Sequence, residues 1–440
     1  MKMNILLINH YAGSIEYGME YRPYYMAKEW AKLGHQVTIV ASSFSHVRSK
    51  QPAVGSQLQE EMVEGIRYMW IKTHAYDGNG AKRALNMFSF VAKLLRFSGK
   101  IARKVQPDLV IASSTYPLDI VPAAVISGRS KAKLVFEVHD LWPLSPIELG
   151  NMSRRHPFIM VMQWAENFAY AKSDHVVSLL PKADTHMIEH GMSPRKFRYV
   201  PNGIDTMEWQ ENVMRIPDEH RSLLMKLKER GEFLIGYAGT HGLANSLNSL
   251  IEAAKLTKGM KISCVLIGKG PDKKRLMQEA KENGLENVYF LPPVPKSSIP
   301  DLLGYMDALY IGLKSEPLFR FGISPNKLID YMMAAKPVVQ SIEAGNDMVA
   351  ECGCGYSVPP ENPKAIADAI VRLANMNYAE REEMGSRGRS FIIQNHDYKV
   401  LAQNFLDVLA NEPSKGGPNH VRSVDQNSAA YRYPTNIQDT

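Results

Sequence analysis

Short apolar runs alternate with amphipathic stretches from the first residues of the chain to about residue 371. The runs are rich in Val, Ile and Leu and have no polar face, which is typical of strands buried in a parallel sheet. The stretches between them show the apolar spacing of helices that pack on such a sheet, and the inward stripe of the first consists of Tyr24, Ala27, Trp30 and Ala31. Repeated units of strand, helix and strand predict an α/β fold built on parallel sheets.

The predicted strands fall into two sets. In the first half of the chain they are Asn4–Asn9, Gln36–Ala41, Ile66–Lys72, Asp108–Ser113, Lys133–Val138, His175–Leu179 and Phe197–Val200. In the second half they are Phe233–Ala238, Ile262–Ile267, Val288–Leu291, Ala308–Gly312 and Pro337–Ser341, with helices beginning near Ser246, Asp272, Ser297, Asn326 and Pro363. Between the sets, Pro201, Asn202 and Gly203 break the pattern, so we place the domain boundary there.

A length of 440 residues suits two α/β domains of similar size. We expect an N-terminal domain at 1–200 and a C-terminal domain at 201–390, followed by a helix at 391–410 that packs back on the N-terminal domain. The tail at 411–440 is rich in Ser, Pro, Gly, Asn and Gln, and we expect disorder there because it can bury little apolar surface. The chain shows no short repeat period, which excludes solenoids and propellers.

Composition and cysteine content indicate the compartment. Apolar residues make up 45% of the chain and charged residues 22%, the balance of a globular protein. The three cysteines, Cys264, Cys352 and Cys354, cannot form a disulfide framework, and no second Cys or His pair completes a zinc site. The first residues hold too short an apolar run for a signal peptide, and no window reaches the ~18 apolar residues of a spanning helix. We therefore expect a reduced, cytoplasmic location.

One segment, Gly322–Met332, has the composition of an anion site at the start of a helix. Ser324 can cap the helix and Pro325 suits its first position, so free backbone N–H groups and the positive end of the helix dipole can hold a diphosphate. Lys327 adds a full charge in the first turn, and Asp330, one turn later on the same face, can accept hydrogen bonds from two ribose hydroxyls. A capped surface helix with an ordinary charge pair has the same features, so the context must decide.

Short motifs supply that context. They are Gly34–Val40, Val138–Asp140, Val200–Asp205, Gly236–Thr240, Leu266–Pro271, Val288–Phe290, Pro325–Leu328 and Gly353–Tyr356. In this order and spacing they resemble the retaining GT-B glycosyltransferases of the family-4 type (glycosyl transferases group 1), which include bacterial lipopolysaccharide, capsule and mannosyl-lipid enzymes. The chain looks most similar to the subgroup that transfers amino-deoxy sugars in surface-polysaccharide assembly. The resemblance implies two Rossmann-like, doubly wound domains that face each other across a cleft.

The resemblance also implies a donor site, with two departures from the family pattern. Asp330 matches the ribose-binding acid of a paired-glutamate motif, but Gly322 stands where that motif has its first Glu. The family's Gly-Arg and following Lys, which clamp the diphosphate, are replaced by Gly239–Gly242 and Asn245, so Lys327 with Arg320 would supply the charge. The expected donor-binding residues are Gly18, Gly239, Thr240, His241, Gly268, Arg320, Ile323, Ser324, Asn326, Lys327 and Asp330.

His139 is the expected catalytic residue. It matches the family histidine beside the donor sugar, and it follows a buried parallel strand, where open α/β sheets bind ligands. There it could hydrogen-bond sugar hydroxyls or stabilise charge as the glycosidic bond breaks, or it could only cap the strand end. Gly13 and Gly18 follow the first strand without the Gly-x-Gly-x-x-Gly pattern of dinucleotide oxidoreductases. No Asp-x-Asp triplet is present, so we expect transfer that needs no metal ion.

The net charge of +7 is concentrated between Ala81 and Val105, where seven basic residues occur without an acid. Four of them share one helical face, and apolar residues cover much of the rest; the four are Lys93, Arg96, Lys100 and Arg103. This composition is typical of a helix that lies on an anionic lipid surface, but a helix packed on the first sheet with solvated lysines would look the same. A nucleic-acid partner is disfavoured because no recognition motif accompanies the charge.

Together these features predict a cytoplasmic enzyme, peripheral on the inner face of the cell membrane, that takes a sugar from a nucleotide donor bound to the second domain. The expected donor is a UDP-linked N-acetylated amino sugar, with no further cofactor. A lipid-linked or polysaccharide acceptor would bind the first domain, within reach of Glu16, Glu20 and Arg22. A nonhydrolysing UDP-sugar epimerase and a polysaccharide-assembly scaffold that has lost transfer are the alternatives, and Gly322 with the missing clamp favours the scaffold.

Overall fold

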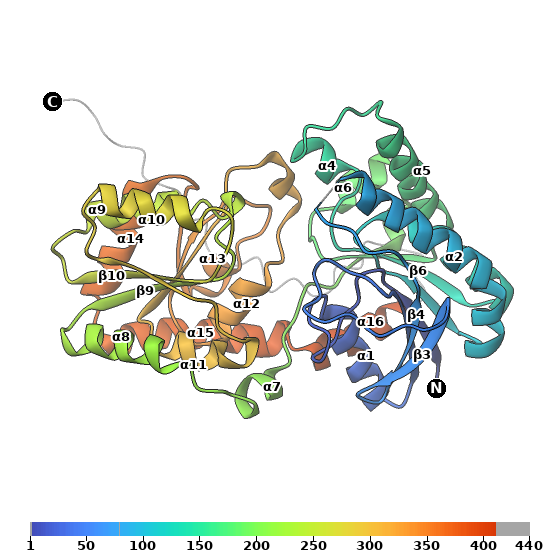
Figure 1. Ribbon diagram of the computed structural model, residues 1–440, viewed down its shortest axis with the longest axis horizontal. Coiled ribbons are helices and arrows are strands. Elements are labelled where there is room, and N and C mark those ends of the chain that lie inside the picture. The colour runs from blue at the N-terminus through green and yellow to red at the C-terminus, as the bar shows by residue number, and fades with distance from the viewer. Residues whose placement is uncertain (1, 79, 411–440) are drawn as a thin grey trace.

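The computed structural model describes residues 2–78 and 80–410, which form two α/β lobes (Figure 1). Each lobe contains one sheet, of eight strands in the N-terminal lobe and six in the C-terminal lobe, with helices on both faces. The predicted fold class is therefore confirmed. The tail at 411–440, expected to be disordered, lies outside the described residues.

The N-terminal sheet has the strand order β3-β4-β2-β1-β5-β6-β7-β8. Its strands are β1 (Asn4–Ile8), β2 (Gln36–Ser42), β3 (Leu58–Val63), β4 (Ile66–Ile71), β5 (Leu109–Ala112), β6 (Lys133–Val138), β7 (His175–Ser178) and β8 (Phe197–Tyr199). All pairings are parallel except that of β3 with β4. We did not predict β3 because this edge strand carries Gln59, Glu60 and Glu61 in place of an apolar run.

Alternate side chains of the central strands pack on opposite faces of this sheet. Leu6 and Ile8 belong to the core under α2 (Ala81–Val105), α3 (Ile120–Ser130) and α5 (Pro157–Lys172). Ile5 and Leu7 belong to the core under α1 (Arg22–Lys32) and α16 (Tyr398–Ala410). Two short helices, α4 (Leu144–Glu148) and α6 (Asp184–Glu189), follow β6 and β7. Because both faces are covered, the strands are apolar on both sides, as the sequence pattern predicts.

The C-terminal sheet is parallel throughout, in the order β11-β10-β9-β12-β13-β14. Its strands are β9 (Phe233–Ala238), β10 (Ile262–Ile267), β11 (Val288–Leu291), β12 (Ala308–Gly312), β13 (Val338–Ser341) and β14 (Gly355–Val358). Its helices are α7 (Thr206–Glu211), α8 (Asp218–Glu229), α9 (Leu247–Leu256), α10 (Lys273–Glu282), α11 (Ile299–Gly304), α12 (Asn326–Met333), α13 (Met348–Cys352), α14 (Pro363–Asn375) and α15 (Tyr378–Asn395). The predicted strands and helix starts are confirmed, and β14 is an addition.

The chain crosses between the lobes twice, and the two crossings are bonded to each other. The N–H of Ile204 donates to the carbonyl of His396 at 2.9 Å. A Cβ on Gly203 would lie 2.6 Å from that carbonyl oxygen, so glycine permits the close approach. After the second crossing, α16 packs on α1, where the indole N–H of Trp30 donates to the carbonyl of Ala402 at 3.0 Å.

Among the parallel strands of each sheet the order changes direction at one point, between β1 and β5 in the N-terminal lobe and between β9 and β12 in the C-terminal lobe. Open α/β sheets bind ligands outside the carboxyl ends of the strands at such a point. The loops that follow these strands are therefore the two places where a site is expected.

Candidate functional site

The candidate donor site lies where β9 ends beside α12. The hydroxyl of Tyr331 on α12 accepts a 2.8 Å hydrogen bond from the N–H of Ala238, which ties the helix to the last residue of β9. Gly239 and Gly268 follow β9 and β10, and a Cβ on Gly268 would lie 1.9 Å from the Gly239 oxygen. Glycine at 268 therefore lets the two loops meet. A recess of about 220 Å³ opens beside them and is also lined by Thr240.

Lys327 is held in the first turn of α12 by uncharged neighbours. Its ammonium donates to the hydroxyl of Tyr237 at 2.8 Å and to Oδ1 of Asn245 at 2.9 Å, and it lies 4.4 Å from the centre of the Tyr237 ring. Burial lowers the pKa of Lys327 to about 8. Since neither partner is an anion, the charge of Lys327 is available to a phosphate group.

Asp330 lies one turn further along α12. Burial raises the pKa of Asp330 to about 7, although the positive charge of Lys296 opposes this shift. The carboxyl group therefore changes between its neutral and charged forms near neutral pH. In the charged form it can accept hydrogen bonds from two hydroxyl groups.

α12 begins where the sequence predicts, but without the predicted cap. The helix begins at Asn326 with no side-chain cap, because the hydroxyl of Ser324 accepts instead from the N–H of Asn202 at 2.9 Å. The side-chain amide of Asn202 also donates to the carbonyl of Ser324 at 2.9 Å. The predicted Ser324 cap is therefore wrong, and this serine ties the segment before α12 to the domain boundary. The first N–H groups of the helix are left without a capping side chain, which suits an anion.

Arg320 is engaged elsewhere. Its guanidinium forms two 2.9 Å hydrogen bonds with the carboxylate of Glu148 on α4, in the other lobe. The expected contact of Arg320 with a diphosphate is therefore replaced by an ion pair between the lobes, and Lys327 is left as the cation at the start of α12.

Gly322, at the position of the family's first Glu, packs against the N-terminal lobe. A Cβ there would come within 2.4 Å of the Pro181 ring, so a larger side chain does not fit in this arrangement. The next residue, Ile323, is buried, and its N–H donates to Oδ1 of Asn346 at 2.8 Å. In this arrangement the N–H of Ile323 is thus bonded to Asn346, a residue that the sequence did not single out, and a contact of Ile323 with the donor stays a prediction.

His139 lies at the carboxyl end of β6 in a largely buried network. Its Nε2 is 3.0 Å from the hydroxyl of Ser113 and 3.2 Å from the carboxylate of Glu137. Burial lowers the pKa of His139, but the hydrogen bond and the negative charge of Glu137 outweigh burial, so that the pKa is raised overall. Glu137 therefore makes the His139 ring easier to protonate than a free imidazole.

Arg22, expected within reach of an acceptor, is instead buried beside Glu137. Its guanidinium donates to the Glu137 carboxylate at 2.9 and 3.1 Å and to the carbonyl of Val200 at 3.0 Å. Burial raises the pKa of Glu137, but the charge of Arg22 and the bond to His139 outweigh it and hold this pKa well below its usual range. Arg22 therefore links His139 to the same domain boundary that holds Ser324. No local pattern marks this role, because the partners of Arg22 are 115 and 178 residues away.

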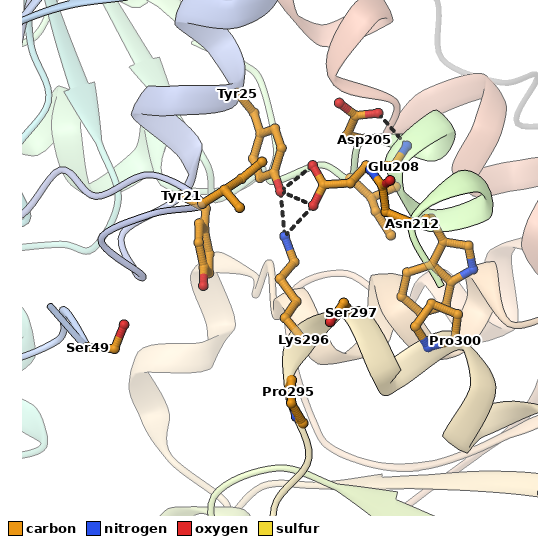
Figure 2. A pocket seen from close by; sticks show the side chains of 13 residues that line it. Tyr21, Tyr25, Ser49, Asp205, Glu208, Asn212, Pro295, Lys296, Ser297 and Pro300 are labelled. Atoms are coloured by element: carbon orange, nitrogen blue, oxygen red, sulfur yellow. Dashed lines mark hydrogen bonds and ion pairs between the residues drawn. The ribbon is translucent and has the colours of Figure 1, made fainter. Parts of the chain in front are cut away.

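A cavity of about 360 Å³ lies between the lobes beside the domain boundary (Figure 2). The ammonium of Lys296 donates to the hydroxyl of Tyr25 at 2.6 Å, and that hydroxyl donates to the carboxylate of Glu208 at 2.9 Å. The same ammonium lies 4.4 Å from the centre of the Tyr21 ring. Burial lowers the pKa of Lys296. Lys296 therefore contacts α1 and α7 while its charge acts on Asp330.

Two other predicted donor residues are enclosed. The backbone N–H and carbonyl of Gly18, which is itself buried, are both bonded to Ser14, at 2.8 and 3.1 Å. The ring of His241 is fully buried, and burial lowers its pKa to about 4. Neither group faces an open site in this arrangement. Asn326, by contrast, is exposed at the first position of α12.

Among the residues that the structure describes, one group of side chains has the spacing of metal ligands. It consists of Glu166, His186 and His190, on and after α5 and α6 of the N-terminal lobe. Nε2 of His186 is 3.0 Å from the Glu166 carboxylate, so these two side chains already satisfy each other. That transfer needs no metal ion stays a prediction.

The basic stripe predicted on α2 is only partly exposed to solvent. Arg96, Lys100 and Arg103 are exposed, whereas Lys93 is half-buried and donates to the carbonyl of Lys72 at 2.6 Å. The opposite face of α2 packs on the sheet, as the second interpretation of this helix expects, and a contact of the exposed basic residues with lipid stays a prediction. Within residues 2–78 and 80–410, no helix is long and apolar enough to cross a bilayer.

Comparison with known families agrees with the two-lobed architecture. A glycosyl transferase 4-like domain matches residues 17–203, and a glycosyl transferases group 1 domain matches residues 225–391. The chain therefore consists of a glycosyl transferase 4-like domain followed by a glycosyl transferases group 1 domain, arranged in the GT-B fold.

Two curated relatives carry glycosyltransferase names. WbjE of Pseudomonas aeruginosa is 22% identical over 315 residues, which are 70% of this chain and 76% of that protein. WcaI of Escherichia coli K12, named as a glycosyl transferase of colanic acid biosynthesis, is 23% identical over 368 residues, 80% of this chain and 89% of that protein.

Solved GT-B structures share the fold at low sequence identity. HepE of Anabaena, in complex with UDP and glucose, has a TM-score of 0.64 and 17% identity, covering 93% of this chain and all of that one. A sucrose-phosphate synthase from Thermosynechococcus elongatus has a TM-score of 0.66 and 16% identity, covering 93% of this chain and 98% of that one.

Proposed function

We propose that this GT-B enzyme moves a sugar from a UDP-linked donor, an N-acetylated amino sugar, to a lipid-linked or polysaccharide acceptor with retention of configuration. The observation that carries the proposal is the placement of Lys327 and Asp330 at an uncapped helix start beside the end of β9. Support for a UDP donor comes from the HepE complexes with UDP and with UDP-glucose. Support for a polysaccharide product comes from the colanic acid name of WcaI.

In this proposal α12 binds the diphosphate and the ribose of the nucleotide. The first N–H groups of the helix and the Lys327 ammonium bind the phosphate oxygens, and the Asp330 carboxylate accepts from the ribose hydroxyls. When the bond between the anomeric carbon and the phosphate oxygen breaks, its electron pair leaves with the diphosphate, while the acceptor hydroxyl oxygen bonds to the anomeric carbon and its proton passes to the released phosphate. A fixed cation and a helix dipole stabilise that charge without a metal ion.

His139 acts on the sugar from the N-terminal lobe. Its Nε2 is occupied by Ser113 and Glu137, which leaves Nδ1 to donate to a hydroxyl of the transferred sugar. The pKa of His139 is raised by Glu137, which favours the protonated form, and in that form the ring also offsets negative charge on the departing phosphate.

The acceptor is reached at the inner face of the cell membrane. The exposed residues Arg96, Lys100 and Arg103 on α2 attract anionic lipid headgroups, and no nucleic acid is required as a partner. A scaffold without transfer is the second candidate, since Gly322 packs on Pro181 and Arg320 pairs with Glu148.

The decisive experiment offers the purified protein a panel of UDP- and GDP-linked sugars, with and without membrane extract, and separates the products by chromatography. Transfer to a lipid or glycan fraction supports the proposal, with Asp330→Ala as the inactive control. A donor converted to its epimer indicates the epimerase instead. Tight UDP binding without either product indicates the scaffold.

A further inference from the structure

The outer face of the N-terminal lobe carries exposed apolar side chains on two helices. On α5, Met160 and Trp164 are 59% and 53% exposed, and on α2, Leu85 and Phe88 are 61% and 38% exposed. α3 lies between these helices and packs on both, and Figure 1 shows α2 and α5 along the outside of the lobe. Phe158 of α5 contacts Phe88 of α2, with 6.4 Å between the ring centres, so the exposed apolar side chains of the two helices adjoin.

The charged residues within the segments that form this apolar face are almost all basic. The segments 81–105, 117–131 and 149–172 contain twelve basic residues and only two acids. Both acids, Asp119 and Glu166, are buried in the lobe. Arg154 and Arg155 are exposed in the loop that leads into α5. A surface that is apolar in its centre, basic at its edges and without exposed acids in these segments is complementary to an anionic bilayer.

We infer that this face, formed by α2, α3, α5 and the loop 149–156, docks on an anionic lipid bilayer, with Met160 and Trp164 inserted at the level of the headgroups. Unlike the basic stripe of α2, α5 offers apolar surface, so the inferred contact is an insertion as well as an electrostatic attraction. A second copy of this chain is a poorer occupant, because it would bring two cationic faces together.

The geometry also relates this face to the cleft. Trp142 follows His139 by three residues, and its ring lies 6.2 Å from that of Phe158, centre to centre. Phe88, Phe158 and Trp142 therefore form a row from the docking face to the loop after β6. A sugar acceptor anchored in the bilayer would reach His139 along this row. Only this last step rests on the proposed function, because lipid binding is measured without any substrate.

The test is sedimentation with vesicles of phosphatidylcholine alone or with about one third phosphatidylglycerol. The variant Met160→Gln/Trp164→Gln keeps charge and helix length, and we expect its partition onto the acidic vesicles to fall by about tenfold. Arg154→Gln/Arg155→Gln should weaken partition by roughly fivefold for each arginine. Added salt should weaken the partition of the parent onto the acidic vesicles. The matched control is Met225→Gln/Met277→Gln, which changes two exposed methionines on α8 and α10 of the other lobe and should bind as the parent does.

A second measurement follows Trp164 itself. We expect acidic vesicles to shift the parent's tryptophan emission to the blue and Trp164→Phe to lose this shift. Equal vesicle binding by the parent and by Met160→Gln/Trp164→Gln would overturn the inference. So would a parent dimer that the same variant converts to a monomer, because the face would then belong to a second copy. Calorimetry with UDP separates the two proposals, since a docking variant that binds UDP normally shows that the donor site is intact.

Discussion

At the scale of single residues, the donor site combines an acid and a base that both titrate near neutral pH. The pKa of Asp330 is raised to about 7 and that of Lys327 is lowered to about 8, in both cases by burial. Asp330 must be ionised to accept from both ribose hydroxyls, and Lys327 must be protonated to attract the diphosphate. A nucleotide sugar, whose diphosphate is esterified at both ends, adds no titration of its own in this range.

We therefore expect the affinity for a nucleotide sugar to rise as the pH increases through about 7 and to fall as it increases through about 8. Isothermal titration calorimetry across this range measures the profile. Asp330→Asn should remove the acidic limb, and Lys327→Met should remove the alkaline limb while lowering affinity throughout. A parent affinity that stays constant over the whole range would contradict the assigned roles.

His139 is expected to matter in the transition state more than in donor binding. His139→Ala removes the donor at the end of β6, and we expect turnover to fall by about 100-fold or more with little change in nucleotide affinity. Transfer at the parent rate would reduce His139 to a structural cap of β6. The conservative variant His139→Gln, which keeps a hydrogen-bond donor but no charge, should retain more activity than alanine if donation to the sugar matters.

At the scale of elements, the apolar pattern is sufficient to predict a strand and its bounds wherever that strand is buried on both faces. β1, β9 and β12 are almost continuous apolar runs, and the sequence predicts them nearly to the residue. β3 was missed because an edge strand does not need that pattern. The start of α12 was predicted correctly, but its contacts were not, since Ser324 pairs with Asn202, 122 residues away, instead of capping the adjacent turn. Such a choice depends on how the lobes are placed, which local spacing does not encode.

The crossing between the lobes gives a stability prediction. A Cβ on Gly203 would lie 2.6 Å both from the carbonyl oxygen of His396 and from a methyl carbon of Leu401. Gly203→Ala must therefore push the two crossings apart, at a cost of about 1–3 kcal/mol. Thermal unfolding should show a lower midpoint than the parent. Gly128→Ala is the control, because a Cβ at this position in α3 meets nothing within 4 Å and should leave the midpoint unchanged or raise it.

At the scale of the whole molecule, the lobes touch on both sides of the cleft. On one side Arg320 pairs with Glu148, and the N–H of Lys182 donates to the carbonyl of Phe321 at 3.0 Å. On the other side Lys296 bridges to Tyr25 and Glu208 (Figure 2). The second contact also affects the donor site, because the Lys296 ammonium lowers the pKa of Asp330, the residue proposed to hold the ribose.

Lys296→Met should therefore change donor binding through Asp330 without touching the diphosphate. Loss of the nearby positive charge removes what opposes the raised pKa of Asp330, so that this pKa moves above about 7. The acidic limb of the affinity profile should shift to higher pH, and affinity at neutral pH should fall by roughly twofold to fivefold, the range expected for a pKa shift of about one half to one unit. Lys255→Met, which removes a lysine paired with Glu252 on α9, is the control with an unshifted profile. If Lys296→Met weakens donor binding equally at every pH, Lys296 supports binding through its contacts between the lobes and not through its effect on the pKa of Asp330.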